Sequence, residues 1–253
     1  MKKTLLGLAA AMMFVAPSFA EDCKFVVGWE PWEPYQMKDA SGNVVGFDME
    51  FVAGVAKHAG CTVDAQELTW ARIIEGIKNG TIDMTGGASL TEERKEFARF
   101  SDAYRKEKMT LFIRKGEGDK FKLSTLEDVL ALGMRIGVTA DYEYGDLYAK
   151  LMEKPEFKAL VDTSASAEIS VKKLLANRID GYMDDELVGI AAAKKNNAMD
   201  KIEANPVEVT ASDIHILTSK KSVSEEMLAK INQAIKDYVA SAEYQALLDK
   251  YFK

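Results

Sequence analysis

The stretch Gly86–Tyr104 reads GGASLTEERKEFARFSDAY and follows the short apolar segment Ile82–Met84, which is typical of a strand. The paired glycines allow the backbone to approach another group closely, because neither residue has a Cβ atom. Ser89 and Thr91 supply hydroxyl groups at an expected helix start, where free backbone N–H groups favour an anion. Arg94 follows about one turn later and offers a planar fork of donors that suits a carboxylate. The stretch therefore predicts a socket for a small anionic group, and the alternative is a solvated loop with a surface arginine.

The first twenty residues have the pattern of an export signal. Lys2–Lys3 precede the apolar run Leu5–Val15, which is too short to span a bilayer, and Ser18–Ala20 supply small residues for cleavage. We expect cleavage after Ala20, no lipid anchor, and an exported soluble protein.

The composition argues against nucleic acid as a partner. The formal charge of the chain is −7 at pH 7, and removal of the two lysines near the N-terminus takes it to about −9. Phosphate binding needs a basic surface, which this chain lacks. The two histidines, His58 and His215, lie on different expected elements, so we expect no metal site and no cofactor.

Cys23 and Cys61 are the only cysteines in the chain. A small, even number of cysteines in an exported protein favours a disulfide. Each cysteine opens an expected strand, and the two strands are joined by one expected helix. If the strands are parallel neighbours, both cysteines lie at the same end of the sheet, so we predict that they are bonded to each other.

Apolar residues recur along the chain with alternating strand and helix periods. The first half has expected strands at 24–29, 62–68, 81–85 and 109–113, and expected helices at about 48–59 and 70–79. After a charged break at 114–120 the pattern restarts, with helices expected at 125–131, from about 143, and at 167–176, 185–195, 223–240 and 242–251, and strands at 134–138, 179–183, 202–208 and 213–218. Repeated βα units predict an α/β fold with mainly parallel, doubly wound sheets. Because the pattern starts twice, we expect two lobes with a binding site in the cleft between them.

Three segments, taken together, resemble the periplasmic solute-binding proteins (family 3) of polar amino-acid ABC transporters. They are GTIDMTGGASLTEER at Gly80–Arg94, FSDAY at Phe100–Tyr104 and GFDMEF at Gly46–Phe51. The resemblance covers nearly the whole mature chain. It implies the two-lobed, type II binding protein fold, in which the chain crosses twice between lobes.

This resemblance implies a domain division and a cellular location. The first lobe is expected to comprise residues 21–113 and 212–253, and the second lobe residues 114–211, with residues 1–20 as the signal peptide. The two crossings, near 109–115 and 208–216, are expected to form the hinge. The protein is expected in the periplasm, as a monomer.

The resemblance also assigns roles to individual residues. Arg94 matches the arginine that pairs with the α-carboxylate of the ligand, and Ser89 and the Gly87 backbone match positions that bind the same end. Asp185 matches the acid of the second lobe that takes the α-ammonium. An arginine on one lobe and an aspartate on the other suit a zwitterion, and only a closed cleft satisfies both.

Other matched positions form the expected walls of the cleft. Glu30 matches an acidic position after the first strand, Trp70 matches an aromatic or apolar wall, and Trp32 is the nearest candidate for the opposite wall. The chain departs from the family at Asp141–Glu143, where small residues are usual. Either Tyr142 packs on the ligand when the cleft closes, or the ligand is not an ordinary α-amino acid.

The resulting hypothesis is a protein that captures an amino acid or related polar solute and delivers it to an ABC transporter permease, without catalysis. One alternative is an enzyme of the same fold, such as a cyclohexadienyl dehydratase, with Glu30 or Glu143 as the acid or base. Another is a sensory protein that presents its ligand to a receptor. The tryptophans and the acids near the cleft favour a cationic or aromatic ligand side chain.

Overall fold

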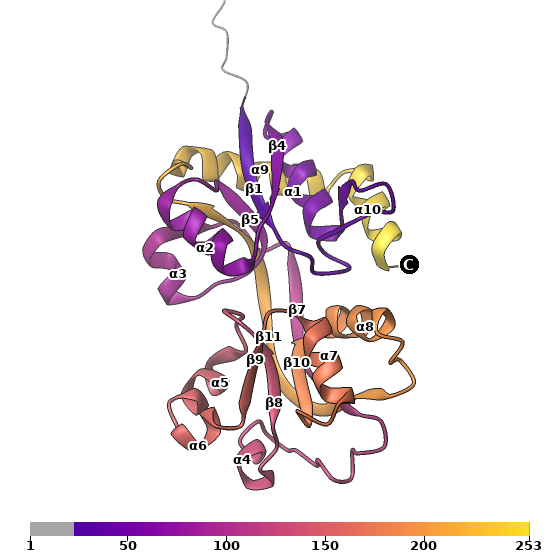
Figure 1. Ribbon diagram of the computed structural model, residues 1–253. Coiled ribbons are helices and arrows are strands. Elements are labelled where there is room, and N and C mark those ends of the chain that lie inside the picture. Colours follow the sequence, from indigo (N-terminus) through magenta and orange to yellow (C-terminus); the bar gives the residue numbers. More distant parts are fainter. Residues whose placement is uncertain (1–22, 253) are drawn as a thin grey trace, which may run out of the picture.

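The computed structural model describes residues 23–252, so the expected signal peptide lies outside the described residues. Figure 1 shows two lobes joined by two long strands, β7 and β11, with the C-terminal helices α9 and α10 on the first lobe. Within the described range, no helix has both the length and the apolar character that a membrane crossing requires.

The strands are β1 (Lys24–Trp29), β2 (Met37–Lys38), β3 (Val44–Val45), β4 (Thr62–Glu67), β5 (Met84–Ser89), β6 (Ala98–Phe100), β7 (Arg105–Arg114), β8 (Ile136–Thr139), β9 (Val161–Ser164), β10 (Gly181–Asp185) and β11 (Ile202–Ser219). The helices are α1 (Phe47–His58), α2 (Trp70–Asn79), α3 (Glu92–Phe97), α4 (Asp128–Leu132), α5 (Gly145–Met152), α6 (Pro155–Lys158), α7 (Ala167–Leu175), α8 (Glu186–Lys195), α9 (Glu225–Val239) and α10 (Ala242–Phe252).

One sheet runs through both lobes, in the order β4-β1-β5-β11-β7-β10-β8-β9, with β6 paired to β11. The outer pairs β1–β4, β1–β5, β8–β9 and β8–β10 are parallel. The central pairs β5–β11, β11–β7 and β7–β10 are antiparallel. The α/β fold is confirmed, but the sheet is more mixed than expected, because the two strands that join the lobes run in opposite directions.

The two crossing strands belong to the sheets of both lobes. The N-terminal part of β7 pairs with 210–214 of β11, and its segment Met109–Ile113 pairs with β10 in the second lobe. The expected strands at 202–208 and 213–218 are one strand, β11, with register shifts on either side of Glu208. The domain boundaries expected at 113 and 211 therefore fall at or near this shared ladder, and they stay predictions.

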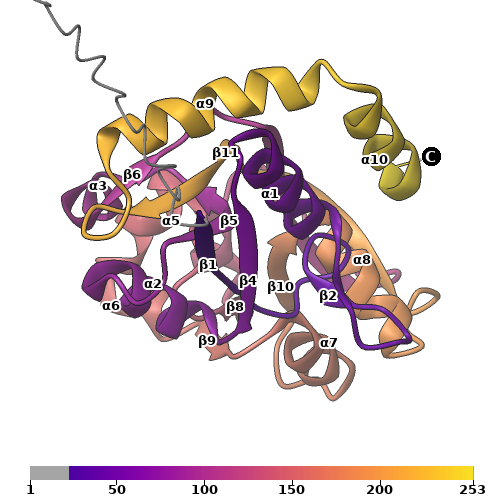
Figure 2. The same ribbon diagram turned by 90° about the horizontal axis from the view of Figure 1, so that it is seen from above.

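Each lobe has helices packed on its part of the sheet. In the first lobe, α1 lies beside α9 on one face and α2 lies on the other face (Figure 2). Phe51 of α1 stacks on Tyr104 with ring centroids 4.3 Å apart, and Ile73 and Ile77 of α2 are fully buried. Complete burial of such side chains contributes about 1.5–3 kcal/mol each. Helix α2 has the predicted bounds and is followed by Gly80, whose positive φ of 87° suits a glycine C-cap.

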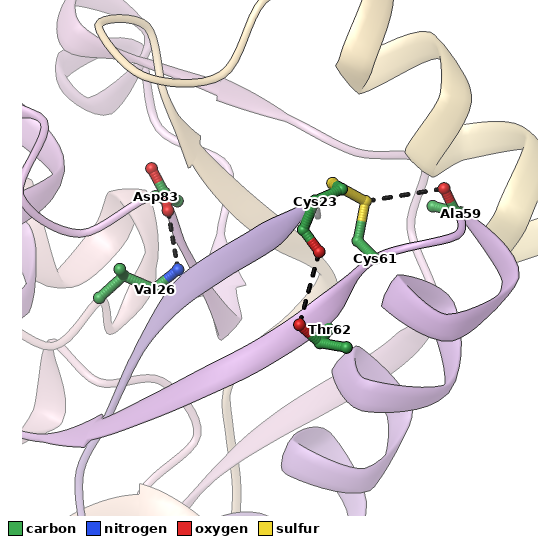
Figure 3. The surroundings of a disulfide bond; sticks show 6 residues. All are labelled: Cys23, Val26, Ala59, Cys61, Thr62 and Asp83. Carbon is green, nitrogen blue, oxygen red and sulfur yellow. Dashed lines mark hydrogen bonds between the residues drawn. A yellow bond between two sulfur atoms is a disulfide. The ribbon is translucent and has the colours of Figure 1, made fainter. Parts of the chain in front are cut away.

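The predicted disulfide between Cys23 and Cys61 is present. It joins the starts of the parallel strands β1 and β4 (Figure 3), and the backbone N–H of Thr62 also donates to the carbonyl of Cys23. The N-terminal ends of these strands lie at the end of the first lobe remote from the second lobe (Figure 1). The disulfide therefore fastens the edge of the sheet away from the cleft.

Replacing Cys23 and Cys61 together by serine should lower the free energy of unfolding by roughly 4 kcal/mol, because the bridge spans a sequence separation of 38 residues and restricts the unfolded chain. Urea unfolding of the oxidised parent and the double variant measures this difference. Ligand affinity should be nearly unchanged, since the bridge is remote from the cleft. Equal unfolding midpoints would contradict the prediction.

Candidate functional site

A cavity lies between the two lobes, and we call it the inner cavity. Its lining residues are Glu30, Trp32, Gln36, Trp70, Gly87, Ser89, Arg94, Glu107, Met109, Tyr142 and Glu143. All ligand-binding residues predicted from the sequence line it except Asp185. Gln36, Glu107 and Met109 were not predicted.

Arg94 is held in the wall of the inner cavity by the turn that precedes it. Thr91 caps α3 by accepting a hydrogen bond from the backbone N–H of Arg94 at 3.2 Å, as expected for this residue type. The Arg94 side chain is only 7% exposed, and its Nη1 donates to the carbonyl of Ser89 at 2.9 Å. Its Nη2 donates to the carbonyl of Asp141 in the second lobe at 3.4 Å, and the guanidinium lies 5.2 Å from the centre of the Trp70 ring.

Gly87 is the position in the predicted socket that requires glycine. Its φ is +78°, and a Cβ atom there would lie 3.1 Å from a carboxylate oxygen of Asp48 and 3.2 Å from the Trp32 ring. Its backbone N–H donates to the hydroxyl of Tyr104 at 2.9 Å. The absence of a side chain thus lets the chain pass between Asp48 and Trp32.

Glu30 follows β1 and lies at the start of α2. One of its oxygens accepts from the backbone N–H of Trp70 at 2.8 Å, and the other accepts from the hydroxyl of Tyr142 at 2.7 Å. Burial raises the pKa of the Glu30 carboxyl, and the hydrogen bonds from Tyr142 and Trp70 oppose this rise. Glu30 therefore has one oxygen that faces a partner from the second lobe.

Aromatic rings surround this end of the cavity. The Tyr142 ring meets Trp32 edge-on with centroids 6.1 Å apart and meets Trp70 edge-on with centroids 6.5 Å apart. We call the space between Trp32 and Trp70, with Glu30 beside it, the aromatic slot. Within residues 23–252, the buried indole N–H of Trp70 has no hydrogen-bond partner.

Glu107 is a buried acid that was not predicted from the sequence. It lies on β7 in the run Arg105–Lys108, and the alternation of the strand turns Glu107 inward while Lys106 and Lys108 are exposed. Burial raises the pKa of Glu107 to about 8, and the charge of Arg105 opposes this rise. The hydroxyl of Ser89 donates to its carboxylate at 3.5 Å. The only signal in the sequence was the period-2 alternation, since a KEK triplet is otherwise typical of a solvated face.

A buried ion pair lies close to the cavity. Arg105 donates to Asp48 through Nε and Nη2, each at 2.9 Å, and its guanidinium lies 3.9 Å from the centre of the Tyr35 ring. The Tyr35 hydroxyl in turn donates to Asp185 of the second lobe at 3.4 Å. This chain of contacts links the lobes behind the inner cavity.

Asp185 caps a helix and faces the first lobe, and its predicted contact with the ligand α-ammonium stays a prediction. Its Oδ1 caps α8 by accepting from the backbone N–H groups of Leu187 at 2.9 Å and Val188 at 3.2 Å, and its Oδ2 faces Tyr35. Both oxygens of Asp185 have protein partners, and Asp185 does not line the inner cavity. The acid that lines the inner cavity next to Ser89 is Glu107.

Acidic groups outnumber the basic group in the wall of the inner cavity. Arg94 is accompanied by Glu30, Glu107 and Glu143, and burial raises the pKa of all three carboxyls. Buried carboxylates are costly unless a positive charge pairs with them. A bound molecule with one carboxylate and two positive groups would match this arrangement. Among the described residues, no cluster of His, Cys, Asp and Glu is arranged to hold a metal ion.

Comparison with known proteins gives a consistent assignment. The family model for bacterial extracellular solute-binding proteins, family 3, matches residues 25–253. The chain is 28% identical to the arginine-binding periplasmic protein of Mannheimia haemolytica, over 99% of this chain and 98% of that protein. It is 23% identical to the L-cystine-binding protein TcyJ of Escherichia coli (strain K12), over 90% and 82% of the two chains.

A solved structure agrees with these relatives. An ancestral arginine-binding protein bound to arginine superimposes with a TM-score of 0.77 and 26% identity, covering 91% of this chain and 98% of that chain. The relatives are binding proteins rather than enzymes. Since the family model spans nearly all of the described residues, the chain belongs to the bacterial extracellular solute-binding proteins, family 3.

Proposed function

We propose that this protein captures a cationic α-amino acid in the periplasm and delivers it, as a monomer, to the permease of an ABC transporter. The observation that supports the proposal is the arrangement of charges in the inner cavity. Arg94 and Glu107 both contact Ser89, and Glu30 lies beside the aromatic slot.

The Arg94 end of the cavity suits the backbone of an amino acid. The guanidinium bonds the Ser89 carbonyl, and Glu107 accepts from the Ser89 hydroxyl, so a positive and a negative group flank one residue. A ligand carboxylate would take the fork of Arg94, and the adjacent ammonium would pair with Glu107. This assignment puts Glu107 in the role that the family resemblance gives to Asp185.

The aromatic slot suits a positively charged side chain. Trp32 and Trp70 present ring surfaces to a cation, and Glu30 offers a carboxylate beside them. A neutral side chain would leave the acids of the cavity without compensation. The side chain of arginine or lysine would bring the second positive charge.

We expect the cleft to close when the ligand contacts residues of both lobes. Arg94, Glu30 and Glu107 come from the first lobe or the crossing strand, whereas Glu143 belongs to the segment of the second lobe that precedes α5. A ligand that touches both sets rewards the closed state, which is the form suited to delivery. This function needs no catalytic step.

The first test is a thermal-shift comparison of L-arginine, L-lysine, L-citrulline and L-glutamate. Arginine and lysine should raise the melting temperature, because a ligand that binds only the folded protein stabilises it. Citrulline resembles arginine in shape but has no positive side chain, so its shift should be much smaller, and glutamate should give none. Equal shifts for arginine and citrulline would refute the cationic assignment.

A separate experiment checks the enzyme alternative. The protein is incubated with arogenate and the solution is followed by NMR, and formation of a product would show that the protein is an enzyme.

Replacement of Arg94 tests the carboxylate end. Arg94→Lys keeps the charge but loses the two-pronged geometry, so arginine affinity should fall about ten-fold or more. Arg94→Ala should cost more, because the ligand carboxylate would be buried without a partner. Isothermal titration calorimetry measures both. The exposed Arg72→Ala serves as a control that should leave the affinity unchanged. An Arg94→Ala variant that binds like the parent would place the carboxylate elsewhere.

Glu107 should release a proton when the ligand binds. Its pKa of about 8 lies above pH 7, so the carboxyl is mostly protonated in the ligand-free closed protein. An ammonium group docked on it favours the ionised form and lowers this pKa, so a proton leaves. Release should be large near pH 7 and should disappear above about pH 9, where the carboxyl is already ionised.

Calorimetry at pH 7 in phosphate and in Tris detects this proton, because the two buffers differ in ionisation enthalpy. The observed binding enthalpy should differ between the buffers for the parent and for Asp185→Asn, but not for Glu107→Gln. Glu107→Gln should also weaken binding more than Asp185→Asn does. The reverse order would assign the ammonium to Asp185, as the family resemblance implies.

A further inference from the structure

Tyr142 makes three contacts across the cleft. Its hydroxyl donates to Glu30 at 2.7 Å, and its ring lies edge-on against both Trp32 and Trp70. The preceding residue, Asp141, accepts a hydrogen bond from Arg94 through its backbone carbonyl. One short segment of the second lobe therefore reaches both ends of the predicted binding site on the first lobe.

These contacts have the same chemistry as those of the proposed ligand. The Asp141 carbonyl gives Arg94 an oxygen acceptor, the Tyr142 ring fills the aromatic slot, and the phenol gives Glu30 a donor. Asp141 has a φ of +61°, a conformation that is uncommon for residues other than glycine. The segment is thus held in an unusual backbone conformation while it faces the first lobe.

Tyr142 also separates the inner cavity from its surroundings. A groove lined by Glu33 and Lys195 opens on one side of the cleft, and a second groove lined by Lys78 and Phe97 opens on another side. Among the described residues, Tyr142 is the one that lines the inner cavity and both of these grooves. Tyr142 therefore lies where the three spaces meet.

We propose that Tyr142 is an internal occupant of the aromatic slot, and that a ligand with a long side chain binds by expelling this ring. The terminal group of such a ligand, a guanidinium or an ammonium, replaces the phenol on Glu30. A ligand with a short side chain leaves Tyr142 in place. Tyr142 is therefore a residue that determines specificity by the length and charge of the ligand side chain.

The selectivity follows from competition. A ligand that needs the slot binds only the fraction of molecules in which the slot is free, so its apparent affinity is reduced by that fraction. A guanidinium or ammonium overcomes this loss, because its bond to a carboxylate is stronger than that of a neutral phenol. A neutral side chain gains no more from Glu30 than Tyr142 already does.

The first experiment uses the ligand-free protein and does not depend on the proposed function. Small-angle X-ray scattering compares the parent with Tyr142→Phe, Tyr142→Ala and the control Tyr148→Phe, which makes the same change in the second lobe away from the cavities. The parent and Tyr148→Phe should be compact, and the radius of gyration should increase in Tyr142→Phe and further in Tyr142→Ala. A Tyr142→Ala protein as compact as the parent would overturn the proposal.

The second experiment measures competition, and this part rests on the proposed function. Calorimetry with L-arginine should give about ten-fold tighter binding for Tyr142→Ala than for the parent, with Tyr142→Phe between them. Binding of L-alanine should not tighten. Weaker arginine binding in both Tyr142 variants would make Tyr142 a wall of the site and overturn the proposal.

The two experiments separate the two hypotheses. If the parent binds neither arginine nor lysine, the proposed function fails, and the scattering of the ligand-free variants still decides whether Tyr142 holds the cleft closed. If arginine binds the parent but the scattering of Tyr142→Ala is unchanged, the proposed function stands and the internal occupant is refuted. Tyr142→Phe keeps the test valid if Tyr142→Ala does not fold.

Discussion

The bidentate ion pair between Arg105 and Asp48 is the contact on which the residues next to the inner cavity depend. Asp48 is fully buried in α1, and Arg105 begins the strand that leads into the second lobe. Loss of one member of such a pair leaves a buried charge and costs about 3–5 kcal/mol. The pair also affects its neighbours. A Cβ atom at Gly87 would lie only 3.1 Å from a carboxylate oxygen of Asp48, and Arg105 packs on Tyr35, which donates a hydrogen bond to Asp185. The Arg105–Asp48 ion pair thus contributes both to the position of Gly87 and to the Tyr35–Asp185 contact between the lobes.

Much of the site could be predicted because its residues belong to contiguous, chemically distinctive segments. Arg94 follows a glycine pair and a capping threonine, and Glu30 follows an apolar strand, so local sequence determines where each side chain lies. Glu107 could not be found this way, because its burial depends on distant segments: β11 pairs with β7 at Glu107, and Ser89 contacts its carboxylate. The family resemblance assigns Asp185 to the ligand, and this role stays a prediction, since helix capping and ligand binding favour the same residue type at the end of a strand.

The sequence predicts the elements of the fold better than it predicts how the strands pair. The periods of apolar residues located most strands and helices, and α2 has the predicted bounds. Strand direction does not follow from such periods, because parallel and antiparallel strands use similar residues. The central antiparallel ladder of β5, β11 and β7 arises only because the chain leaves the first lobe through β7 and returns through β11. The continuity of β11 through its register shifts was equally invisible, since polar residues near Glu208 resemble a loop.

The chemistry of the cleft can be understood as a balance of buried charge. Between the lobes, Glu107 is buried and Glu30 and Glu143 are partly buried, and burial raises the pKa of each acid. Without a ligand, the protein can reduce the cost of burying these carboxylates in two ways. The acids can keep their protons, or they can accept hydrogen bonds from neutral donors such as the hydroxyls of Tyr142 and Ser89. A cationic ligand offers a third way that neutral donors cannot match in a medium of low dielectric constant. The burial that raises the pKa of these acids therefore also makes the closed cleft selective for positive charge.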